Sequence, residues 1–351
     1  MATIAIVGAG IAGLTCGKML QTAGHHVIWV EKSRGVGGRL ATRRLGEGAW
    51  VNHGLRHWPA LEPSLQELTH TLTQQQMLFP WSAQGFLWQG HLRPQSEQLY
   101  CTDAGVNAIA KYLARGANIQ RQQTVTALLS SAAGWQLQTL DAHQTSHSIA
   151  ADIVVLAIPA PQASPLVARL DPAAAISLNA VDYSPSLSLM ATYGSLPQIS
   201  HLDHQQGWYI TAEHPVITWL SLDSSRPKLR PAIHGVMVQS QADFAASYLQ
   251  RLDAIDNDDP SKIDHLQQET IRHLFSAVEE IVPGLNQPDS VRLHRWRYSV
   301  VNQAHPHQFW QSPWDTLVGC GDWCNPEGTS HLAAAYASGV ATAQYVCRVA
   351  A

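Results

Sequence analysis

A glycine-rich loop set between a short apolar strand and a predicted helix constrains the fold of this chain more than any other feature. Residues 3–7 are a continuous apolar and β-branched run, which is typical of a buried parallel strand. The segment Gly8-Ala-Gly10-Ile-Ala-Gly13 follows at once and fits G-x-G-x-x-G. A helix is predicted after it, ending at Gly24, and His26–Val30 is predicted as the next strand. The N-terminus therefore predicts a β-α-β unit of a parallel-sheet α/β domain.

Each glycine of this loop has a physical role in binding a dinucleotide. Gly8 permits the tight turn, Gly10 lets the backbone approach a pyrophosphate, and Gly13 allows close packing of helix on strand. The first turn of the helix adds a partial positive charge beside the phosphates. Glu31, 18 residues past Gly13 at the end of the second predicted strand, is placed to accept a hydrogen bond from a ribose hydroxyl. Strand, loop, helix and acid together predict a nucleotide cofactor.

Composition excludes several other classes of protein. The chain has 351 residues with 22 Lys plus Arg against 26 Asp plus Glu, and a net charge of −4 does not indicate a nucleic-acid binder. Its apolar runs are shorter than the roughly 20 residues that a membrane span needs. The first residues lack the basic segment of a signal peptide. Five cysteines do not make a disulfide scaffold, so we expect a cytoplasmic protein.

Three further motifs resemble a known group of flavoproteins. Gly35-Val-Gly-Gly38-Arg39 follows the ribose acid, His294-Arg-Trp296-Arg-Tyr298 lies late in the chain, and Gly319-Cys-Gly321-Asp322 precedes an Ala-rich predicted helix. This series is similar to the flavin amine-oxidase superfamily, and the Trp-Arg stretch is similar to its renalase-like branch. Asp223-Ser-Ser-Arg226-Pro resembles a short motif of that branch's substrate domain. The resemblance implies FAD as the cofactor. The cysteinyl context usual for a covalent link is not evident near the C-terminus, so we expect non-covalent binding, and we expect no metal ion because the histidine pairs lack a third ligand at metal spacing.

The resemblance also implies a two-domain fold in which the chain crosses between domains several times. We expect a Rossmann-like FAD-binding domain, a parallel sheet with a β-meander, made of residues 1–75, 101–160 and 296–351. An interleaved substrate domain, a mixed α+β sheet, is expected to comprise residues 76–100 and 161–295. The contacts to the cofactor are then assigned to Gly8, Gly10, Ile11, Ala12, Gly13, Glu31, Lys32, Gly38, Arg39, His53, Gly54, Val125, Gly321, Asp322, Leu332 and Ala333.

The chain departs from the superfamily pattern at the positions expected beside the flavin. A Glu-Gly pair that often opens the last helix is replaced by Ala333-Ala334, which removes a carboxylate contact. A Gly-Ala-Gln stretch is replaced by Asn52-His-Gly-Leu-Arg56-His57, which is expected to bring two polar or cationic groups to the pocket. Gln239 stands where some renalases have histidine. The nature of the substrate is therefore open.

The predicted activity is oxidation of a small molecule by hydride transfer to flavin N5, with O2 as the acceptor that reoxidises the flavin. Resemblance to renalases implies NAD(P)H or its misreduced isomers as the substrate. Such a transfer requires no general base, only stacking and alignment. The pocket candidates are Trp296, Gln239, His57 and Arg56, the last for a substrate phosphate or carboxylate. Two alternatives remain: an amine oxidase or desaturase-like enzyme with a hydrophobic substrate, and a flavoprotein with a binding or sensory role.

Other residue patterns support weaker hypotheses. The pairs His25-His26 and His305-Pro-His307 lack a third ligand at metal spacing, so surface or loop histidines are favoured. Cys320 and Cys324 lack the spacing of a redox pair, so both are expected to be small residues lining the cofactor turn. Trp81, Trp88 and Trp219 fit either an aromatic substrate pocket or core packing.

The middle of the chain predicts shorter elements. Residues 61–76 are predicted as helical and 77–100 as short strands. A helix is predicted over Asp103–Arg115 with Asp103 as its cap, followed by one strand over Ile119–Leu129 and a β-meander to about residue 148. From 160 to 295 we expect short strands, such as those at 216–220 and 235–239, and helices near 241–252 and 262–281, separated by an acidic loop.

Overall fold

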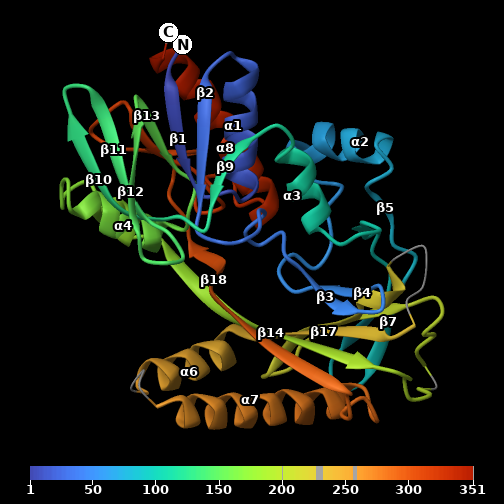
Figure 1. Ribbon diagram of the computed structural model, residues 1–351. Helices are drawn as coiled ribbons and strands as arrows, with labels where there is room; N and C mark the ends of the chain where they lie inside the picture. The colour runs from blue at the N-terminus through green and yellow to red at the C-terminus, as the bar shows by residue number, and fades with distance from the viewer. Residues whose placement is uncertain (200, 227–231, 256–258, 351) are drawn as a thin grey trace.

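The sheet that carries the glycine loop is parallel and central to the first lobe of the molecule (Figure 1). The computed structural model describes residues 1–199, 201–226, 232–255 and 259–350. Six strands lie in the order β19-β20-β13-β1-β2-β9, and only the edge strand β19 is antiparallel to its neighbour. Their bounds are β1 Thr3–Val7, β2 His26–Glu31, β9 Asn118–Arg121, β13 Ile153–Leu156, β19 Trp310–Gln311 and β20 Leu317–Gly319.

Strand alternation on β1 divides the apolar residues between the two faces of this sheet. Ile4 and Ile6 join the core under helices α1 (Ile11–Thr22), α3 (Asn107–Leu113) and α8 (His331–Val349). Ala5 and Val7 join the core on the other face, beneath a meander formed by β10 (Thr124–Ser131), β11 (Gly134–Leu140) and β12 (Ser146–Ala151). The predicted α/β class, with parallel sheet and meander, is confirmed.

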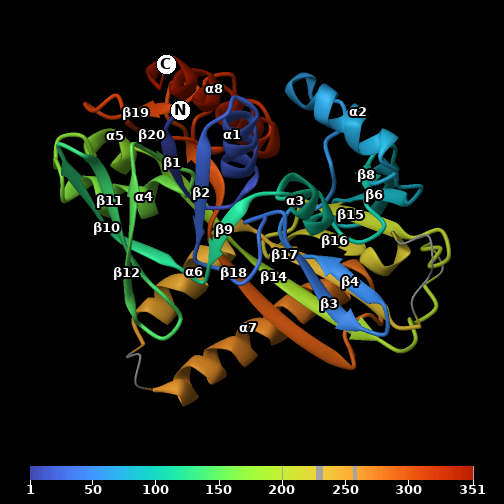
Figure 2. The same cartoon turned by 45° about the horizontal axis from the view of Figure 1, so that its top comes forward.

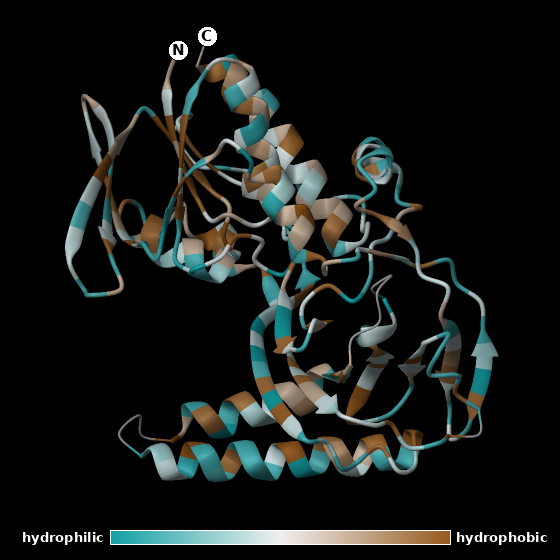
Figure 3. Ribbon diagram, turned by 45° about the vertical axis from the view of Figure 1, so that its right-hand side comes forward, coloured by the Kyte–Doolittle hydropathy of each residue, from teal (hydrophilic) through white to brown (hydrophobic). Residues whose placement is uncertain are grey.

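The second lobe is a mixed sheet with two helices packed on one face. Its strands lie in the order β18-β14-β17-β16-β15-β6-β7. Helices α6 and α7 contribute to the cores on the outer face, and hydrophilic residues follow the far side of α7 in Figure 3. The bounds are β6 Gln84–Trp88, β7 Leu92–Gln95, β14 Asp182–Tyr193, β15 Trp208–Ala212, β16 Ile217–Leu222, β17 His234–Ser240, β18 Ser290–Gln303, α6 Ala242–Asp253 and α7 Pro260–Ile281.

Two long paired strands join the lobes. β14 and β18 are antiparallel and run from beneath the parallel sheet into the second lobe in both views (Figures 1 and 2). They have 12 and 14 residues, where the sequence predicted only short strands. Because both reach across the junction, they carry side chains from the second lobe to the carboxyl edge of the parallel sheet.

Smaller elements complete the fold. The hairpin β3-β4 lies against β17 and the short helix η2, and a second strand pair, β5-β8, leads into and out of the second lobe. Residues 61–76, predicted as helical, form a 3-10 turn and a helix. The bounds are β3 Thr42–Gly46, β4 Ala49–Asn52, β5 Phe79–Pro80, β8 Tyr100–Cys101, η1 Pro63–Leu65, α2 Gln66–Gln74, α4 Ala160–Ala168, α5 Ile176–Asn179 and η2 Asp223–Ser225.

The start of α3 differs from the prediction. The helix begins at Asn107, and Asp103 does not cap it. Its first N–H groups are instead bound by side chains from another hairpin, since Asn52 Oδ1 accepts from the Val106 N–H at 3.0 Å and Thr42 Oγ1 from the Asn107 N–H at 3.1 Å. A tertiary cap replaces the local one.

The single strand predicted over Ile119–Leu129 is two strands. β9 ends at Arg121 in the parallel sheet, and β10 begins at Thr124 in the meander. Gln122 between them has φ +56°, a left-handed conformation that ends the extended backbone. The turn moves the chain from one sheet to the other.

The packing of α4 and α5 bears on where the lobes divide. Ala163, Val167 and Leu178 belong to the same core as Val7 of the parallel sheet and Leu137 of the meander. We therefore propose that the boundary predicted at residue 161 lies near residue 182, where β14 begins. The acidic loop predicted between α6 and α7 includes residues 256–258, which lie outside the described residues, as does Pro227 of the motif after Asp223.

Candidate functional site

A cleft of about 1830 Å³ lies along the carboxyl ends of the parallel strands and extends to the inner face of the second lobe. It is lined by the glycine loop after β1, the end of β2, the segment after β13 and the start of α8. Residues of β17 and β18 line its other side. Ligands of open α/β sheets bind at this edge of the sheet, so the topology marks the cleft as the candidate site.

The glycine loop has the close contacts that its spacing predicts. Gly8 has φ +104°, and its N–H donates to the Val30 carbonyl at 2.9 Å. A Cβ on Gly13 would lie 2.3 Å from the Gly8 carbonyl oxygen, so only glycine lets α1 start this close to the strand. A Cβ on Gly10 would meet nothing within 4 Å, because this residue borders the open cleft. Packing thus requires glycine at position 13, whereas at position 10 the space is left to a ligand.

The N-terminus of α1 is a ready site for an anion. Gly10 is its N-cap and supplies no side-chain cap, and its first turn holds no acidic residue. The first N–H groups of an α-helix have no partner within the helix, and those of α1 begin at the cleft beside Gly10, Ile11 and Ala12. Together with the helix dipole they fit a pyrophosphate.

Glu31 closes the glycine loop as well as bordering the cleft. Its Oε2 accepts from the Ala9 N–H at 2.8 Å and its Oε1 from the Ser33 N–H at 2.8 Å. The residue is 7% exposed, and it also lines the cleft. The carboxylate is therefore held in one orientation, with remaining acceptor capacity for a ribose hydroxyl.

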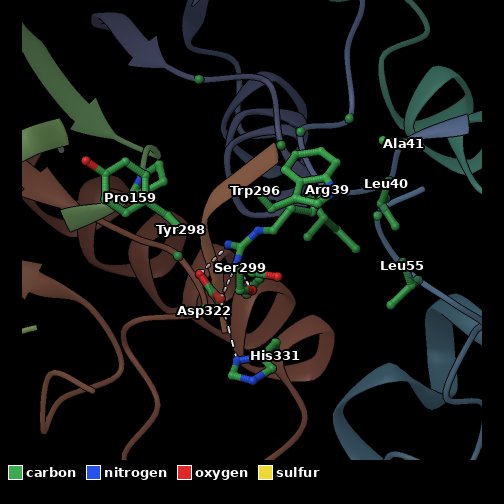
Figure 4. Close-up of a pocket in the computed structure, with 18 of the residues that line it drawn as sticks. Arg39, Leu40, Ala41, Leu55, Pro159, Trp296, Tyr298, Ser299, Asp322 and His331 are labelled. Atoms are coloured by element: carbon green, nitrogen blue, oxygen red, sulfur yellow. Dashed lines mark hydrogen bonds and ion pairs between the residues drawn. The ribbon is translucent and has the colours of Figure 1, made fainter. Parts of the chain in front are cut away.

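Arg39 and Asp322 form a bidentate ion pair across the cleft (Figure 4). The two guanidinium nitrogens donate to the two Asp322 oxygens at 2.6 and 2.5 Å, and one also donates to the Ser299 carbonyl at 3.0 Å. Burial acts against the Arg39 cation, but Asp322 outweighs it and the pKa of Arg39 lies above its ordinary value. Tyr183 and His331 also contact the Asp322 carboxylate, at 3.4 and 3.6 Å. The pair joins the loop after β2 to β18 and to the start of α8.

The segment Asn52–His57 forms the second side of the cleft. Arg56 Nε donates to Gln239 Oε1, and Gln239 Nε2 donates to the Gly54 carbonyl at 2.9 Å. The Arg56 guanidinium lies 5.3 Å from the centre of the Trp219 ring. Burial lowers the pKa of Arg56 to about 10, so this side chain is a cation at neutral pH. Gln239 fixes its direction without neutralising it.

His53, His294 and Trp296 form an aromatic cluster at the cleft. The His53 and Trp296 rings are stacked at 5.6 Å, and the His294 ring stands edge-on to both. The Trp296 indole N–H and the Ser188 hydroxyl both donate to the His53 carbonyl, at 2.6 and 2.7 Å. These contacts fix the backbone after β4 against β14 and β18.

The histidines of the cleft are neutral at physiological pH. Burial, with His294 and Arg43 adding to it, lowers the pKa of His53 to about 3. Burial, followed by the charges of Arg226 and Arg56, lowers the pKa of His57 to about 4. Arg56 and His57 were predicted to bring two polar or cationic groups to the pocket. In the structure Arg56 is a cation and His57 is a neutral ring.

The cleft brings together the residues that the sequence predicted for the cofactor and the substrate, with two exceptions. Gly13 and Ala333 do not line it, because Gly13 packs on the Gly8 carbonyl and Ala333 lies fully buried in the core under α8. The predicted residues that do line it are Gly8, Gly10, Ile11, Ala12, Glu31, Lys32, Gly38, Arg39, His53, Gly54, Arg56, His57, Val125, Gln239, Trp296, Gly321, Asp322 and Leu332.

Three residues of the site are not among those predicted from the sequence. Ser299 and Tyr183 contact the Arg39–Asp322 pair, and His331 lines the cleft at the start of α8. Ser299 takes part through its backbone, which leaves no sequence signal. His331 stands directly after Ser330, whose side chain caps α8 at the Ala333 N–H, so the helix-start pattern was the available signal.

The weaker sequence hypotheses concern residues outside the cleft. Trp81 and Trp219 are 6% and 2% exposed and belong to a small core with Tyr209, and neither lines the cleft. Burial raises the pKa of Cys320 to about 12, and that of Cys324 well above its usual value, so both thiols stay protonated. Within the described ranges, His, Cys, Asp and Glu form no group of three that could hold a metal ion.

The chemistry of the cleft fits a flavin dinucleotide. The uncapped start of α1 suits the pyrophosphate, and Glu31 suits a ribose. Because Gly10 has no side chain and borders open space, the pyrophosphate can come close to the backbone there. Farther along, Asp322 and the start of α8 border the same space, and Trp296 faces them from β18. A long ligand lying from Glu31 to Trp296 would contact every one of these groups.

Comparison with known families gives two matches to the chain. Residues 6–74 match the NAD(P)-binding Rossmann-like domain, and residues 80–347 match the flavin-containing amine oxidoreductases. Renalase of Mus musculus is 24% identical over 332 residues, covering 87% of this chain and 86% of that protein. L-amino-acid oxidase of Siganus canaliculatus is 53% identical over 47 residues, which is 13% of this chain and 9% of that protein.

Solved structures share the fold at low sequence identity. Cyclohexylamine oxidase from Brevibacterium oxydans superposes with a TM-score of 0.68 at 12% identity, covering 99% of each chain. A triple mutant of putrescine oxidase redesigned in cofactor binding superposes with a TM-score of 0.71 at 12% identity, again over 99% of each chain. At this identity the likeness establishes the two-lobed fold alone. Among the described residues, no helix is both long and apolar enough to cross a membrane.

Proposed function

The chain belongs to the flavin-containing amine oxidoreductases and is an FAD-dependent oxidoreductase, and from this premise we propose that its hydride donor is a dihydronicotinamide. The donor would be NAD(P)H or one of its misreduced isomers, with O2 as the final electron acceptor. Similarity to renalase over most of the chain supports this proposal. Of the relatives reported above, L-amino-acid oxidase of Siganus canaliculatus shares a segment of 47 residues, and cyclohexylamine oxidase shares the fold at 12% identity.

The observation that carries the proposal is the charge of the pocket. Arg56 is a buried cation whose hydrogen-bond partner is the neutral amide of Gln239. In the part of the chain that the structure describes, the acids that line the cleft are Glu31 and Asp322, and these are bound by backbone N–H groups and by Arg39. A cationic amine would meet Arg56 without a free carboxylate, whereas a phosphate would bind its guanidinium fork.

The side chains around the pocket suit a reaction that needs alignment more than proton transfer. FAD, when bound, supplies the acceptor for a hydride. The aromatic rings of Trp296 and His53 are stacked on each other at the cleft, and Trp296 is fixed by its indole hydrogen bond to the His53 carbonyl. His53 and His57 remain neutral, so neither is a cation that would repel an oxidised, positively charged nicotinamide product. The chain's contribution is to bind the donor through Arg56, orient its ring and exclude water.

Anaerobic stopped-flow reduction of the purified holoprotein tests the proposal. NADH, NADPH, their misreduced isomers and a panel of primary and polyamines would be mixed with the oxidised protein, and flavin absorbance followed. We expect a dihydronicotinamide to bleach the flavin faster than every amine. Rapid bleaching by an amine, with all dihydronicotinamides inert, would instead establish an amine oxidase, the function that the matching family favours.

The mode of cofactor binding has its own test. We propose one FAD per chain, held without a covalent link, in a protein of the cytoplasm. Denaturation followed by filtration should release all of the yellow colour into the filtrate. Colour retained on the polypeptide would contradict the non-covalent mode, and oxygen consumption during turnover would test O2 as the acceptor.

A further inference from the structure

A buried ion pair lies behind the cleft, in the motif that the proposed function does not use. Asp223 begins the short helix η2 and Arg226 directly follows its last residue, and both side chains are 0% exposed. An Arg226 nitrogen lies 2.9 Å from Asp223 Oδ1, and the guanidinium also lies 4.1 Å from the centre of the Trp81 ring. Neither residue lines the cleft. Full burial of two charges is costly, so the pair calls for a structural reason.

The ion pair forms hydrogen bonds with the segment Asn52–His57 near both of its ends. Asp223 Oδ2 accepts from the Asn52 N–H at 2.6 Å, and Arg226 donates to the Arg56 carbonyl. Asp223 Oδ1 accepts from the Ser221 hydroxyl at 2.6 Å, which in turn accepts from the Trp219 indole. The segment held in this way carries Arg56 and His57 into the cleft.

We propose that Asp223 and Arg226 are positioning residues that fix the segment Asn52–His57, so that Arg56 and His57 meet the substrate in one arrangement. The proposal rests on the proposed function only for the identity of that substrate. Arg226 acts on the segment from behind, through a backbone carbonyl. Both side chains contact the buried Trp219 ring behind the cleft: the centre of the His57 ring lies 5.8 Å from it and the Arg56 guanidinium 5.3 Å.

The charge of Arg226 also reaches the pocket. Within the described residues, the charged groups that act on His57 are Arg226 and Arg56, both of which favour the neutral ring, and a hydrogen bond with the Trp58 backbone opposes them. Burial raises the pKa of Asp223, while Arg226, Ser221 and Asn52 act in the opposite direction. Removing the Arg226 charge should therefore bring the pKa of His57 closer to its ordinary value of 6.5.

The test replaces both charges at once, because a single replacement would leave an unpaired buried charge that can unfold the protein. Asp223→Asn with Arg226→Gln forms the neutral variant, and Arg226→Lys keeps the charge without the planar fork. The matched control is Arg251→Gln with Glu269→Gln, which removes an exposed ion pair between α6 and α7. Readouts are the pKa of the His57 ring by NMR, assigned with His57→Gln, and KM and kcat for whichever donor reduces the flavin.

In the neutral variant we expect the pKa of His57 to rise towards its ordinary value, because Arg226 acts directly on this ring, whereas the Asp223 carboxylate is bound by the Asn52 N–H and the Ser221 hydroxyl. We expect KM to rise about tenfold, the loss of one buried hydrogen bond, with a smaller change in kcat and full flavin content. Arg226→Lys should leave the pKa of His57 unchanged while raising KM, and the control should change neither. A neutral variant that folds with the original His57 pKa and KM would overturn the proposal. The NMR readout requires no substrate, so failure of the dihydronicotinamide assignment would be distinguished from failure of this one.

Discussion

At the scale of single residues, the site divides into side chains that bind the cofactor and side chains that present the substrate. Among the residues that the structure describes, the acids that line the cleft are Glu31 and Asp322. Each is already oriented by protein groups, the first by two backbone N–H groups and the second by Arg39. Arg56 is different, because its partner Gln239 is neutral and leaves the positive charge to act on a ligand. Two predictions separate these roles.

Replacing Glu31 should weaken FAD binding. Glu31→Ala removes an acceptor for a ribose hydroxyl and frees the Ala9 and Ser33 N–H groups, so we expect a loss of about 1.5–3 kcal/mol in FAD affinity. Titration of the apoprotein with FAD, followed by flavin fluorescence, measures it. Glu67→Ala, an exposed acid in the first turn of α2, is the control. An unchanged affinity in Glu31→Ala would show that the ribose assignment is wrong.

Replacing Arg56 should weaken donor binding and leave the cofactor in place. With Arg56→Gln we expect KM for the dihydronicotinamide to rise about 10- to 100-fold, since one charge-assisted hydrogen bond is lost, while flavin content stays the same. Steady-state kinetics at two salt concentrations measure it, and KM of the variant should depend less on salt. Arg297→Gln is the control, because Arg297 borders the cleft but both its terminal nitrogens are bound by Asp253. Equal effects of the two substitutions would contradict the role of Arg56.

At the scale of elements, the start of α1 combines packing and binding within one turn. The helix approaches β1 closely because Gly13 has no side chain, and Gly339 of α8 approaches α1 in the same way, where a Cβ would lie 2.5 Å from the Ala12 carbonyl oxygen. The uncapped N–H groups of the first turn then point to the cleft and not to a side-chain acceptor. Packing and cofactor binding therefore place different demands on neighbouring glycines.

Alanine substitutions in the loop should separate these two demands. Gly13→Ala should destabilise the apoprotein by about 1–3 kcal/mol or more, because its Cβ would meet the Gly8 carbonyl and the Ala157 side chain. Gly10→Ala should leave the apoprotein as stable as before, since its Cβ enters open space, yet it should block the approach of FAD. Thermal unfolding of the apoproteins and FAD titration test both halves. If the Gly10→Ala protein binds FAD normally, the cofactor does not bind beside Gly10.

At the scale of the whole molecule, the site lies at the junction of the two lobes. The strands β14 and β18, which join the lobes, bring Ser188, His294 and Trp296 into contact with His53, directly after β4. Burial at this junction keeps His53 and His57 neutral. The stability of the whole protein should therefore depend on the protonation of these rings.

We expect the protein to lose stability as the pH falls from about 6.5 to 4. The two rings titrate near 6.5 in the unfolded chain, whereas burial in the folded protein lowers the pKa to about 4 for His57 and about 3 for His53. In that window the unfolded chain binds protons that the folded chain does not, so the free energy of unfolding falls, by on the order of several kcal/mol for the two rings. Above about pH 6.5 both states are neutral at these rings and the effect vanishes.

Calorimetric unfolding of the apoprotein from pH 7.5 to pH 4.5 measures this dependence. His57→Gln should show a shallower fall in melting temperature, because one of the two linked rings has been removed. His91→Gln, an exposed residue beside β7, is the control and should follow the original protein. The same pH dependence in His57→Gln and in the original protein would show that His57 is not linked to folding.

The site residues that the sequence predicted are those with short-range patterns. The loop Gly8–Gly13, Glu31 and the pair Gly321-Asp322 follow from glycine and acid spacing at the ends of apolar strands, a pattern that local geometry imposes. The renalase-like stretch around Trp296 also lines the cleft, but only similarity to a family indicated it. Predictions failed where a local signal competed with a distant partner, as at α3, which Asn52 caps in place of Asp103.

The sequence by itself determined the β-α-β start, the two buried strands of the parallel sheet and the need for a nucleotide at their carboxyl edge. Only the tertiary structure decided that Arg39 meets Asp322, that Gln239 binds the Arg56 side chain while Arg226 binds the Arg56 carbonyl, and that His57 stays neutral. Each of these contacts joins residues more than 165 positions apart, or depends on the water that folding excludes. The order of strands in two sheets sets such contacts, and no spacing along the chain encodes that order.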